Sequence, residues 1–78
     1  MNLEKAFGIE LRKLREQKGF SQEKLGFESG YHRTYISQLE RGQKSPTLKA
    51  ILQIANALDA KASNLIAKIE KKTANVRQ

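Results

Sequence analysis

The stretch from Ser21 to Gly42 reads SQEKLGFESGYHRTYISQLERG, and its pattern predicts two short helices joined by a tight turn. Ser21 is a good N-cap for the first helix, because its hydroxyl can accept a hydrogen bond from a free amide of the first turn. Gly30 ends this helix, since glycine readily adopts the left-handed conformation that follows many helices. The second helix is predicted from about His32 to Arg41, with Gly42 as its stop.

The second of these helices has two faces of opposite character. Side chains placed at intervals of about 100° put four polar groups into one sector of about 140° and the apolar groups on the other side. One face can be buried while the other offers a guanidinium, two hydroxyls and an amide, which are groups that read base edges in the DNA major groove. The polar face consists of Arg33, Thr34, Ser37 and Gln38, and the apolar face of Ile36 and Leu39.

The composition is that of one small cytosolic domain. The chain has 78 residues, of which 38% are hydrophobic, and it has no cysteine. Disulfides and thiolate metal sites are therefore excluded, and a reducing cytoplasm is the expected compartment. The first residues, MNLEKAFGIELRKLR, contain no apolar run of signal-peptide length, and charges interrupt every candidate membrane span. We expect a cytoplasmic protein with no membrane partner.

The chain carries a strong positive charge. Fifteen Lys and Arg residues against eight Asp and Glu residues give a net charge of +7. On so small a body, this field favours an anionic partner such as double-stranded DNA. Surplus lysine can also serve solubility alone, so the charge supports DNA binding only together with the helix pattern.

The rest of the chain also predicts helices, which gives an all-α fold of five short helices around one core. A first helix ends at Gly19, a fourth begins at Pro46 or Thr47, and Ser63 is expected to cap a fifth. We expect the domain to span residues 1–70 and a polar tail to fray over residues 71–78. The predicted inward stripes are Leu3, Phe7, Leu11 and Leu14, then Leu48, Ile51, Leu52, Ala55 and Leu58, then Leu65, Ile66 and Ile69.

Three segments in this order resemble the phage-repressor-like (Cro/repressor, XRE-type) helix-turn-helix family. They are LRKLREQKGFSQEKL at 11–25, YISQLERG at 35–42 and SPTLKAILQIANAL at 45–58, and the resemblance covers residues 5–70. It implies a five-helix lambda-repressor-like domain. The string RTYIS at 33–37 and the aromatic Phe27 look most like the controller proteins of restriction–modification systems, which are small homodimeric regulators of their own operon. Similar strings also occur in other small repressors.

The resemblance implies roles for particular residues. The helix from about His32 would enter the major groove while the preceding helix crosses the DNA backbone. Arg33, Thr34 and Gln38 match positions that face base edges, and Gln22 matches a position that hydrogen-bonds phosphate. Arg15 and Glu40 match a structural ion pair between the first and third helices.

The chemistry of the side chains refines these roles. Arg33 suits bidentate binding to guanine, although a solvated arginine or a phosphate contact is the alternative. Gln38 could read adenine, Thr34 could touch a thymine methyl group, and Ser37 could donate to a phosphate or a base. Tyr35 lies between the two faces, where its hydroxyl could reach phosphate. The candidate contacts to the DNA backbone are Gln22, His32, Tyr35, Arg41, Gln43 and Lys44.

Three residues depart from the common pattern of the family or have two readings. Gly26 stands where alanine is usual, which predicts a helix weaker by roughly 1 kcal/mol. His32 is the only histidine, so a metal site is not expected, and Ser or Asp would be a better cap at its position. Phe27 is expected to pack at the edge of the core or against the first helix.

The predicted function is a DNA-binding transcriptional regulator that works as a homodimer and occludes or recruits RNA polymerase. Leu65, Ile66 and Ile69 offer apolar surface that could complete the core and form a dimer interface. The alternative is an antitoxin-type or other protein-interaction module in which DNA binding is secondary. An enzyme is not expected, because the chain has no cysteine, one histidine and no Gly-rich phosphate loop. No cofactor, metal or small-molecule ligand is expected.

Overall fold

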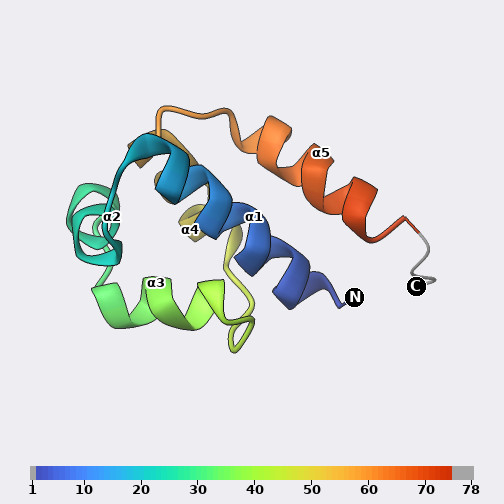
Figure 1. Cartoon of the computed structure of the whole chain (residues 1–78), viewed down its shortest axis with the longest axis horizontal. Helices are drawn as coiled ribbons and strands as arrows, with labels where there is room; N and C mark the ends of the chain where they lie inside the picture. Colours follow the sequence, from blue (N-terminus) through green and yellow to red (C-terminus); the bar gives the residue numbers. More distant parts are fainter. Residues whose placement is uncertain (1, 75–78) are drawn as a thin grey trace.

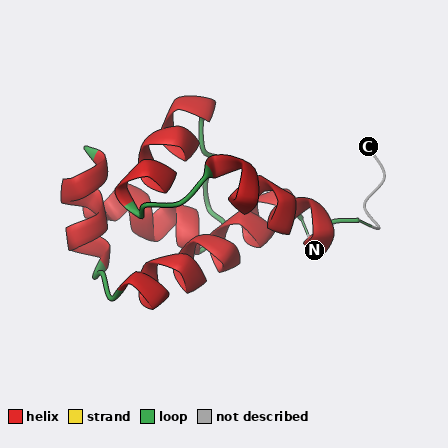
Figure 2. Ribbon diagram, turned by 90° about the horizontal axis from the view of Figure 1, so that it is seen from above, coloured by secondary structure: helices red, strands yellow, loops and turns green. Residues whose placement is uncertain are grey.

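The computed structural model describes residues 2–74, and all of its regular elements within them are helices (Figures 1 and 2). The predicted all-α fold of five helices is confirmed. Each helix lies within about two residues of its predicted position. The helices are α1 (Leu3–Lys18), α2 (Gln22–Ser29), α3 (Arg33–Glu40), α4 (Leu48–Ala57) and α5 (Ala62–Lys72).

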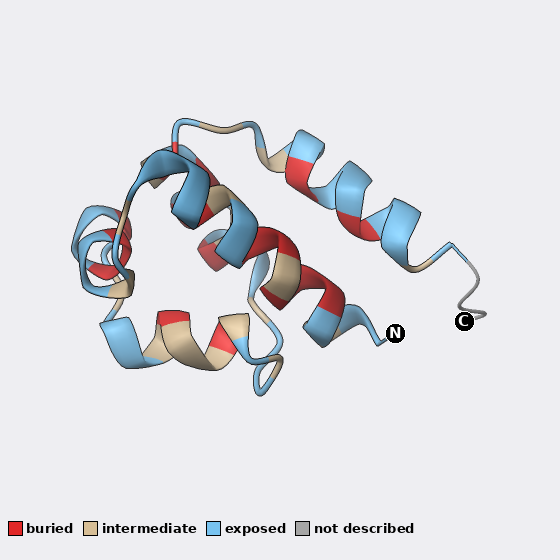
Figure 3. Cartoon of the chain, viewed as in Figure 1, coloured by how far each residue is buried: buried red, intermediate tan, exposed pale blue. Residues whose placement is uncertain are grey.

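Helix α1 is the longest helix and lies between α3 and α5. It packs against α3 on one side and α5 on the other, while α4 packs against α2 and α5 (Figure 1). The buried residues of the helices face one another between these elements (Figure 3). The largest fully buried side chains come from all helices except α5, and they are Leu11, Leu25, Ile36, Leu39, Ile54 and Leu58.

A glycine allows α1 and α3 to approach closely. A Cβ atom built on Gly8 would lie 2.5 Å from the carbonyl oxygens of both Leu39 and Glu40. Carbon atoms do not come so near to backbone oxygens, so only glycine permits this spacing. Gly8 therefore sets the distance between α1 and the end of α3, a role that its sequence pattern does not indicate.

The ends of α5 differ from the prediction. The helix begins at Ala62 with Lys61 in the N-cap position and no side-chain cap, so the expected cap by Ser63 is wrong. Lys71 and Lys72 belong to the helix rather than to a frayed tail. Residues 75–78 of the expected tail lie outside the described residues.

The apolar residues of α5 divide between the core and the surface. Leu65 and Ile69 are 3% and 4% exposed, whereas Ile66 is 38% exposed. Residues four apart share one face of a helix, so Leu65 and Ile69 point together into the core, and Ile66 is turned about 100° away. Leu65 and Ile69 are thus excluded from the expected dimer interface, and Ile66 remains available.

The predicted inward stripes of α1 and α4 also need correction. Leu3, Leu48 and Leu52 are 55%, 73% and 52% exposed, while Ile54 is fully buried. On α4 the buried face is formed by Ala50, Ile54 and Ala55. The sequence offered apolar residues on more than half of this helix, and only packing against α2 and α5 selected the inner face.

Candidate nucleic-acid interface

Helices α2 and α3 form a helix-turn-helix unit whose turn depends on two glycines. Gly30 ends α2 in the left-handed conformation with φ 83°, as predicted. Gly26 is buried, and a Cβ atom on it would lie 2.5 Å from the carbonyl oxygen of Tyr31. The expectation that Gly26 only weakens α2 therefore missed its main role, because the glycine is what lets the turn fold back onto α2.

The N-terminus of α3 is capped by His32. Its Nδ1 atom accepts a hydrogen bond from the backbone amide of Thr34 at 3.0 Å, and its backbone is extended as in other N-caps. The sequence pattern predicts a helix from about His32, at a position where Ser or Asp would be the better cap. The structure instead uses a ring nitrogen where an oxygen is usual.

Helix α3 presents the two faces that its sequence predicts. Ile36 and Leu39 are fully buried in the core. Arg33 and Thr34 are exposed in the first turn, and Ser37 and Gln38 are half-buried further along the helix. The four candidate base-reading side chains therefore lie away from the buried face, with the two exposed ones nearest the helix-turn-helix turn.

A buried ion pair joins α1 to the end of α3. The Arg15 side chain is 11% exposed and that of Glu40 is 3% exposed. Arg15 donates through Nε to Glu40 Oε2 and through Nη2 to Glu40 Oε1 at 3.0 Å, and its Nη1 donates to the Phe20 carbonyl at 2.8 Å. The hydrogen bond to Glu40 raises the pKa of Arg15 despite its burial, so this guanidinium stays charged.

Gln22 connects the start of α2 to this ion pair. Its Nε2 group donates to Glu40 Oε1 at 3.1 Å. An amide nitrogen has two hydrogens, so Gln22 can keep this bond and still donate to a phosphate. Glu40 thus accepts hydrogen bonds from two residues, Arg15 and Gln22, which lie on different helices.

Two tyrosines pack together beside α3. The ring centroids of Tyr31 and Tyr35 lie 5.0 Å apart at an interplanar angle of 34°. Tyr35 is half-buried against the core, and its burial, together with the neighbouring Tyr31, raises its pKa above the ordinary value. Tyr35 therefore remains a neutral hydroxyl that can donate a hydrogen bond at physiological pH.

Hydrogen bonds to backbone carbonyls of α3 hold the polar segment that follows this helix. The amide of Gln43 donates to the carbonyl of Gln38 at 2.9 Å, and Arg41 Nε donates to the carbonyl of Ser37 at 3.4 Å. The side chains of Arg41, Gln43 and Lys44 are all exposed. This segment brings two positive charges and an amide to the C-terminal end of α3, while His32 lies at its N-terminal end.

Phe27 does not pack against the core or α1, and the prediction for it is wrong. Its side chain is 83% exposed, because Phe27 lies about 200° around α2 from the buried Leu25. The ring lines a shallow depression with His32 and Arg33, and Arg33 Nη1 lies 3.9 Å from Glu23 Oε2 across it. The acidic neighbour of Arg33 was not anticipated from the sequence.

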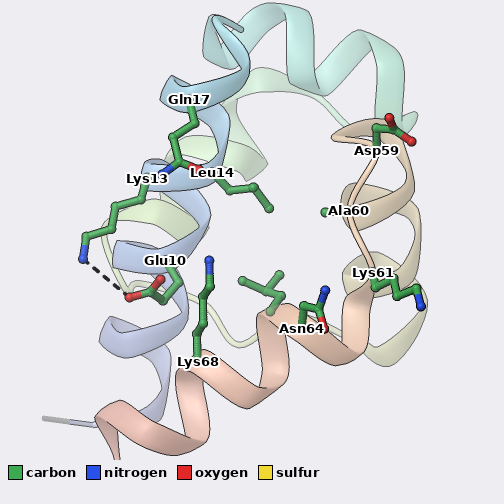
Figure 4. Close-up of a pocket in the computed structure, with 10 residues that line it drawn as sticks. Glu10, Lys13, Leu14, Gln17, Asp59, Ala60, Lys61, Asn64 and Lys68 are labelled. Carbon is green, nitrogen blue, oxygen red and sulfur yellow. Dashed lines mark ion pairs between the residues drawn. The ribbon is translucent and has the colours of Figure 1, made fainter.

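A second pocket, with several charged side chains at its rim, lies between α1 and the start of α5 (Figure 4). Lys13 Nζ lies 3.7 Å from Glu10 Oε2, and Lys72 Nζ lies 3.3 Å from the same oxygen. The pair of Lys72 with Glu10 ties α5 to α1, whereas the pair of Lys13 with Glu10 lies within α1. Among residues 2–74 no group of three or more His, Cys, Asp or Glu residues could hold a metal ion. No helix in the same range is long and apolar enough to cross a membrane.

Comparison with known proteins identifies the family. The helix-turn-helix family model matches residues 11–65. The chain is 42% identical over 66 residues to the control protein C.BamHI of Bacillus amyloliquefaciens, a match that covers 83% of this chain and 82% of that protein. The restriction–modification controller protein C.AhdI from Aeromonas hydrophila superposes with a TM-score of 0.78 at 47% identity, over 80% of this chain and 94% of that chain. The clp gene regulator ClgR from Corynebacterium glutamicum superposes with a TM-score of 0.89 at 28% identity, over 96% of this chain and 80% of that chain. The chain therefore belongs to the helix-turn-helix family of transcriptional regulators and is close to the controller proteins of restriction–modification systems.

Proposed function

We propose that this protein binds DNA sequence-specifically, with α3 as the recognition helix in the major groove. The observation that carries the proposal is the division of α3 into a buried face, Ile36 and Leu39, and an exposed first turn that holds Arg33 and Thr34. Recognition helices of this kind contact base edges with residues near their N-terminal end. The net charge of +7 supports the same partner, because it attracts the phosphate backbone.

The side chains of α3 would read bases in a defined order. Arg33 would bind the O6 and N7 atoms of a guanine through its guanidinium. Thr34 would contact a thymine methyl group, and Gln38 would bind an adenine. Ser37 would donate to a base or to the nearest phosphate.

Residues around both ends of α3 would hold the DNA backbone. Backbone contacts fix the register of a recognition helix and carry little sequence information of their own. Gln22 has a free amide hydrogen beside its bond to Glu40, and Tyr35 keeps a neutral hydroxyl. The proposed set of backbone contacts is Gln22, His32, Tyr35, Arg41, Gln43 and Lys44.

The protein would act as a homodimer through a face formed by α4 and α5. Leu48 and Leu52 are exposed one turn apart on α4, and Ile66 of α5 lines an apolar groove with Pro46 and Ile51. A single module buries only about 600–1,000 Å² on DNA, which limits its selectivity. Two copies related by a twofold axis would read inverted half-sites about one helical turn apart.

The similarity to controller proteins suggests the biological setting. We infer that the protein controls the operon of a restriction–modification system, where its occupancy of a promoter either blocks RNA polymerase or recruits it. Such a regulator acts in the cytoplasm, where the bacterial DNA is. The concentration of the protein itself is expected to set the level of transcription, because both dimerisation and promoter occupancy rise with that concentration.

Selection from a randomised duplex pool at physiological salt tests this function. The expected result is an inverted repeat whose half-sites are centred about 10 bp apart. Absence of enrichment, with binding that falls steeply as salt rises, would mean that the charge binds DNA without selectivity. The antitoxin-type alternative would then take precedence, and the search would turn to a protein partner.

A further inference from the structure

The cap of the recognition helix differs chemically from the other side-chain caps in the described part of the chain. Asn2, Ser21 and Thr47 begin their helices with oxygen atoms, which accept hydrogen bonds from amides at 2.8, 2.9 and 3.0 Å. His32 begins α3 with Nδ1, which accepts from the amide of Thr34 at 3.0 Å. Within residues 2–74, α3 alone is capped by an imidazole nitrogen, whose lone pair can hold either the amide hydrogen bond or a second proton.

This hydrogen bond determines the protonation state of the ring. Nδ1 can accept from an amide only through its lone pair, so the capping imidazole is neutral and carries its proton on Nε2. A doubly protonated ring has no lone pair left for the amide of Thr34. It would also place a positive charge at the positive end of the helix dipole. Protonation of His32 therefore removes the cap and repels the helix end.

No acidic residue of the first turn of α3 compensates for this loss. The titratable and charged side chains that line the same depression as the His32 ring are Glu23 from α2, Tyr31 from the turn and Arg33 from α3. The opposite charges of Glu23 and Arg33 lie 3.9 Å apart and offset each other in the free protein. The imidazole is the only side chain that caps α3.

We propose that His32 is the positioning residue of the recognition helix, and that its neutral Nε2–H tautomer is required for selective DNA binding. This inference rests on the proposed function. The capped amide belongs to Thr34, and Arg33 precedes it, so the cap helps to fix the first turn of α3, from which these two of the four base-reading side chains project. It adds to the backbone hydrogen bonds that the amides of Tyr35 and Ile36 donate to the His32 carbonyl. Selective binding then weakens as the ring gains a proton. A histidine that bound phosphate as a cation would have the opposite effect.

The first experiment compares the affinity for the selected operator with that for an unrelated duplex of equal length, at about pH 8 and about pH 5.5 at fixed salt. In the wild type, the ratio of the two affinities is expected to fall at the lower pH by about three- to tenfold per half-site, as for a lost N-cap. His32→Asn keeps a capping oxygen that does not titrate in this range. It loses the backbone contact proposed for His32 on both duplexes alike, so its affinities should fall together and their ratio should stay high at both pH values. His32→Gln is too long to cap and should have a low ratio at both.

The second measurement needs no DNA. Hydrogen-exchange protection of the Thr34 amide in the free protein should be lost in His32→Gln and, on acidification, in the wild type, but not in His32→Asn. Asn2→Ala serves as the control, because it removes the cap of α1 and should leave the pH dependence of operator selectivity unchanged.

Two results would overturn the inference. One is a wild-type affinity ratio that holds or rises at the lower pH, which would indicate a cationic phosphate contact. The other is unchanged protection of the Thr34 amide in His32→Gln. If the wild type selects no duplex at all, the proposed function fails, and the exchange measurement alone then decides whether His32 holds the helix.

Discussion

The substitution Glu40→Gln removes one charge from the buried pair while it preserves the shape of the side chain. Glu40 is 3% exposed and accepts from Arg15 and Gln22. In the variant, the new amide group faces a donor of Arg15, so one of the two parallel hydrogen bonds is lost. The Arg15 guanidinium also stays buried without its counter-charge.

The expected cost is about 3–5 kcal/mol of unfolding free energy, as for other buried pairs that lose one partner. This is a large share of the roughly 5–15 kcal/mol that stabilises a typical domain. Urea unfolding at a fixed protein concentration measures it. The matched control is Glu16→Gln, because the pair of Glu16 with Arg12 is 55% and 65% exposed and should contribute below about 0.5 kcal/mol.

Equal unfolding free energies of Glu40→Gln and Glu16→Gln would refute this reasoning. They would show that solvent screens the buried pair of Glu40 as well as it screens the exposed pair of Glu16. A double variant, Arg15→Met with Glu40→Met, provides a further check. Removal of both charges avoids an uncompensated ion, so the double variant should be more stable than Glu40→Gln alone.

Four further outcomes follow from the structure. Arg33→Ala should cost about 1–3 kcal/mol of operator binding and relax selectivity at one base pair per half-site, whereas uniform weakening across duplexes would identify a phosphate contact. Gly26→Ala should lower stability by about 1–3 kcal/mol in thermal unfolding, because its methyl group meets a backbone carbonyl, and a more stable variant would contradict that contact. Leu52→Glu should shift the protein to monomer in sedimentation at micromolar concentration, with Gln53→Glu as the control, and an unchanged dimer would move the interface elsewhere. The raised pKa of Tyr35 means that the unfolded chain ionises first, so stability should fall as pH rises past about 10, and Tyr35→Phe should reduce that fall in urea unfolding.

Local patterns determined much of the fold. Helix periodicity, the capping residue Ser21 and the stops at Gly19 and Gly30 act over a few residues of chain, so they can be read without the rest of the molecule. The same is true of the two faces of α3, since the angle between neighbouring side chains is a property of the helix itself. These features suffice for the five helices and for the polar face of α3.

Contacts between helices decided the remainder. The sequence does not specify which of several apolar residues on α4 and α5 faces inward. Leu48 and Leu52 were therefore expected in the core, and the expected division of Leu65, Ile66 and Ile69 between core and dimer interface was left open. Phe27 was misplaced for the same reason, because the inner face of α2 is already filled by other residues.

The glycines and the histidine depend on tertiary structure in a different way. Gly8 and Gly26 matter because the backbones of other segments lie 2.5 Å from where their Cβ atoms would be, and such distances exist only in the folded chain. The sequence alone determined that His32 stands at the start of α3. Only the folded turn decided that Nδ1 points at the Thr34 amide, because the ring orientation depends on the backbone angles of the turn and on the groups packed around it.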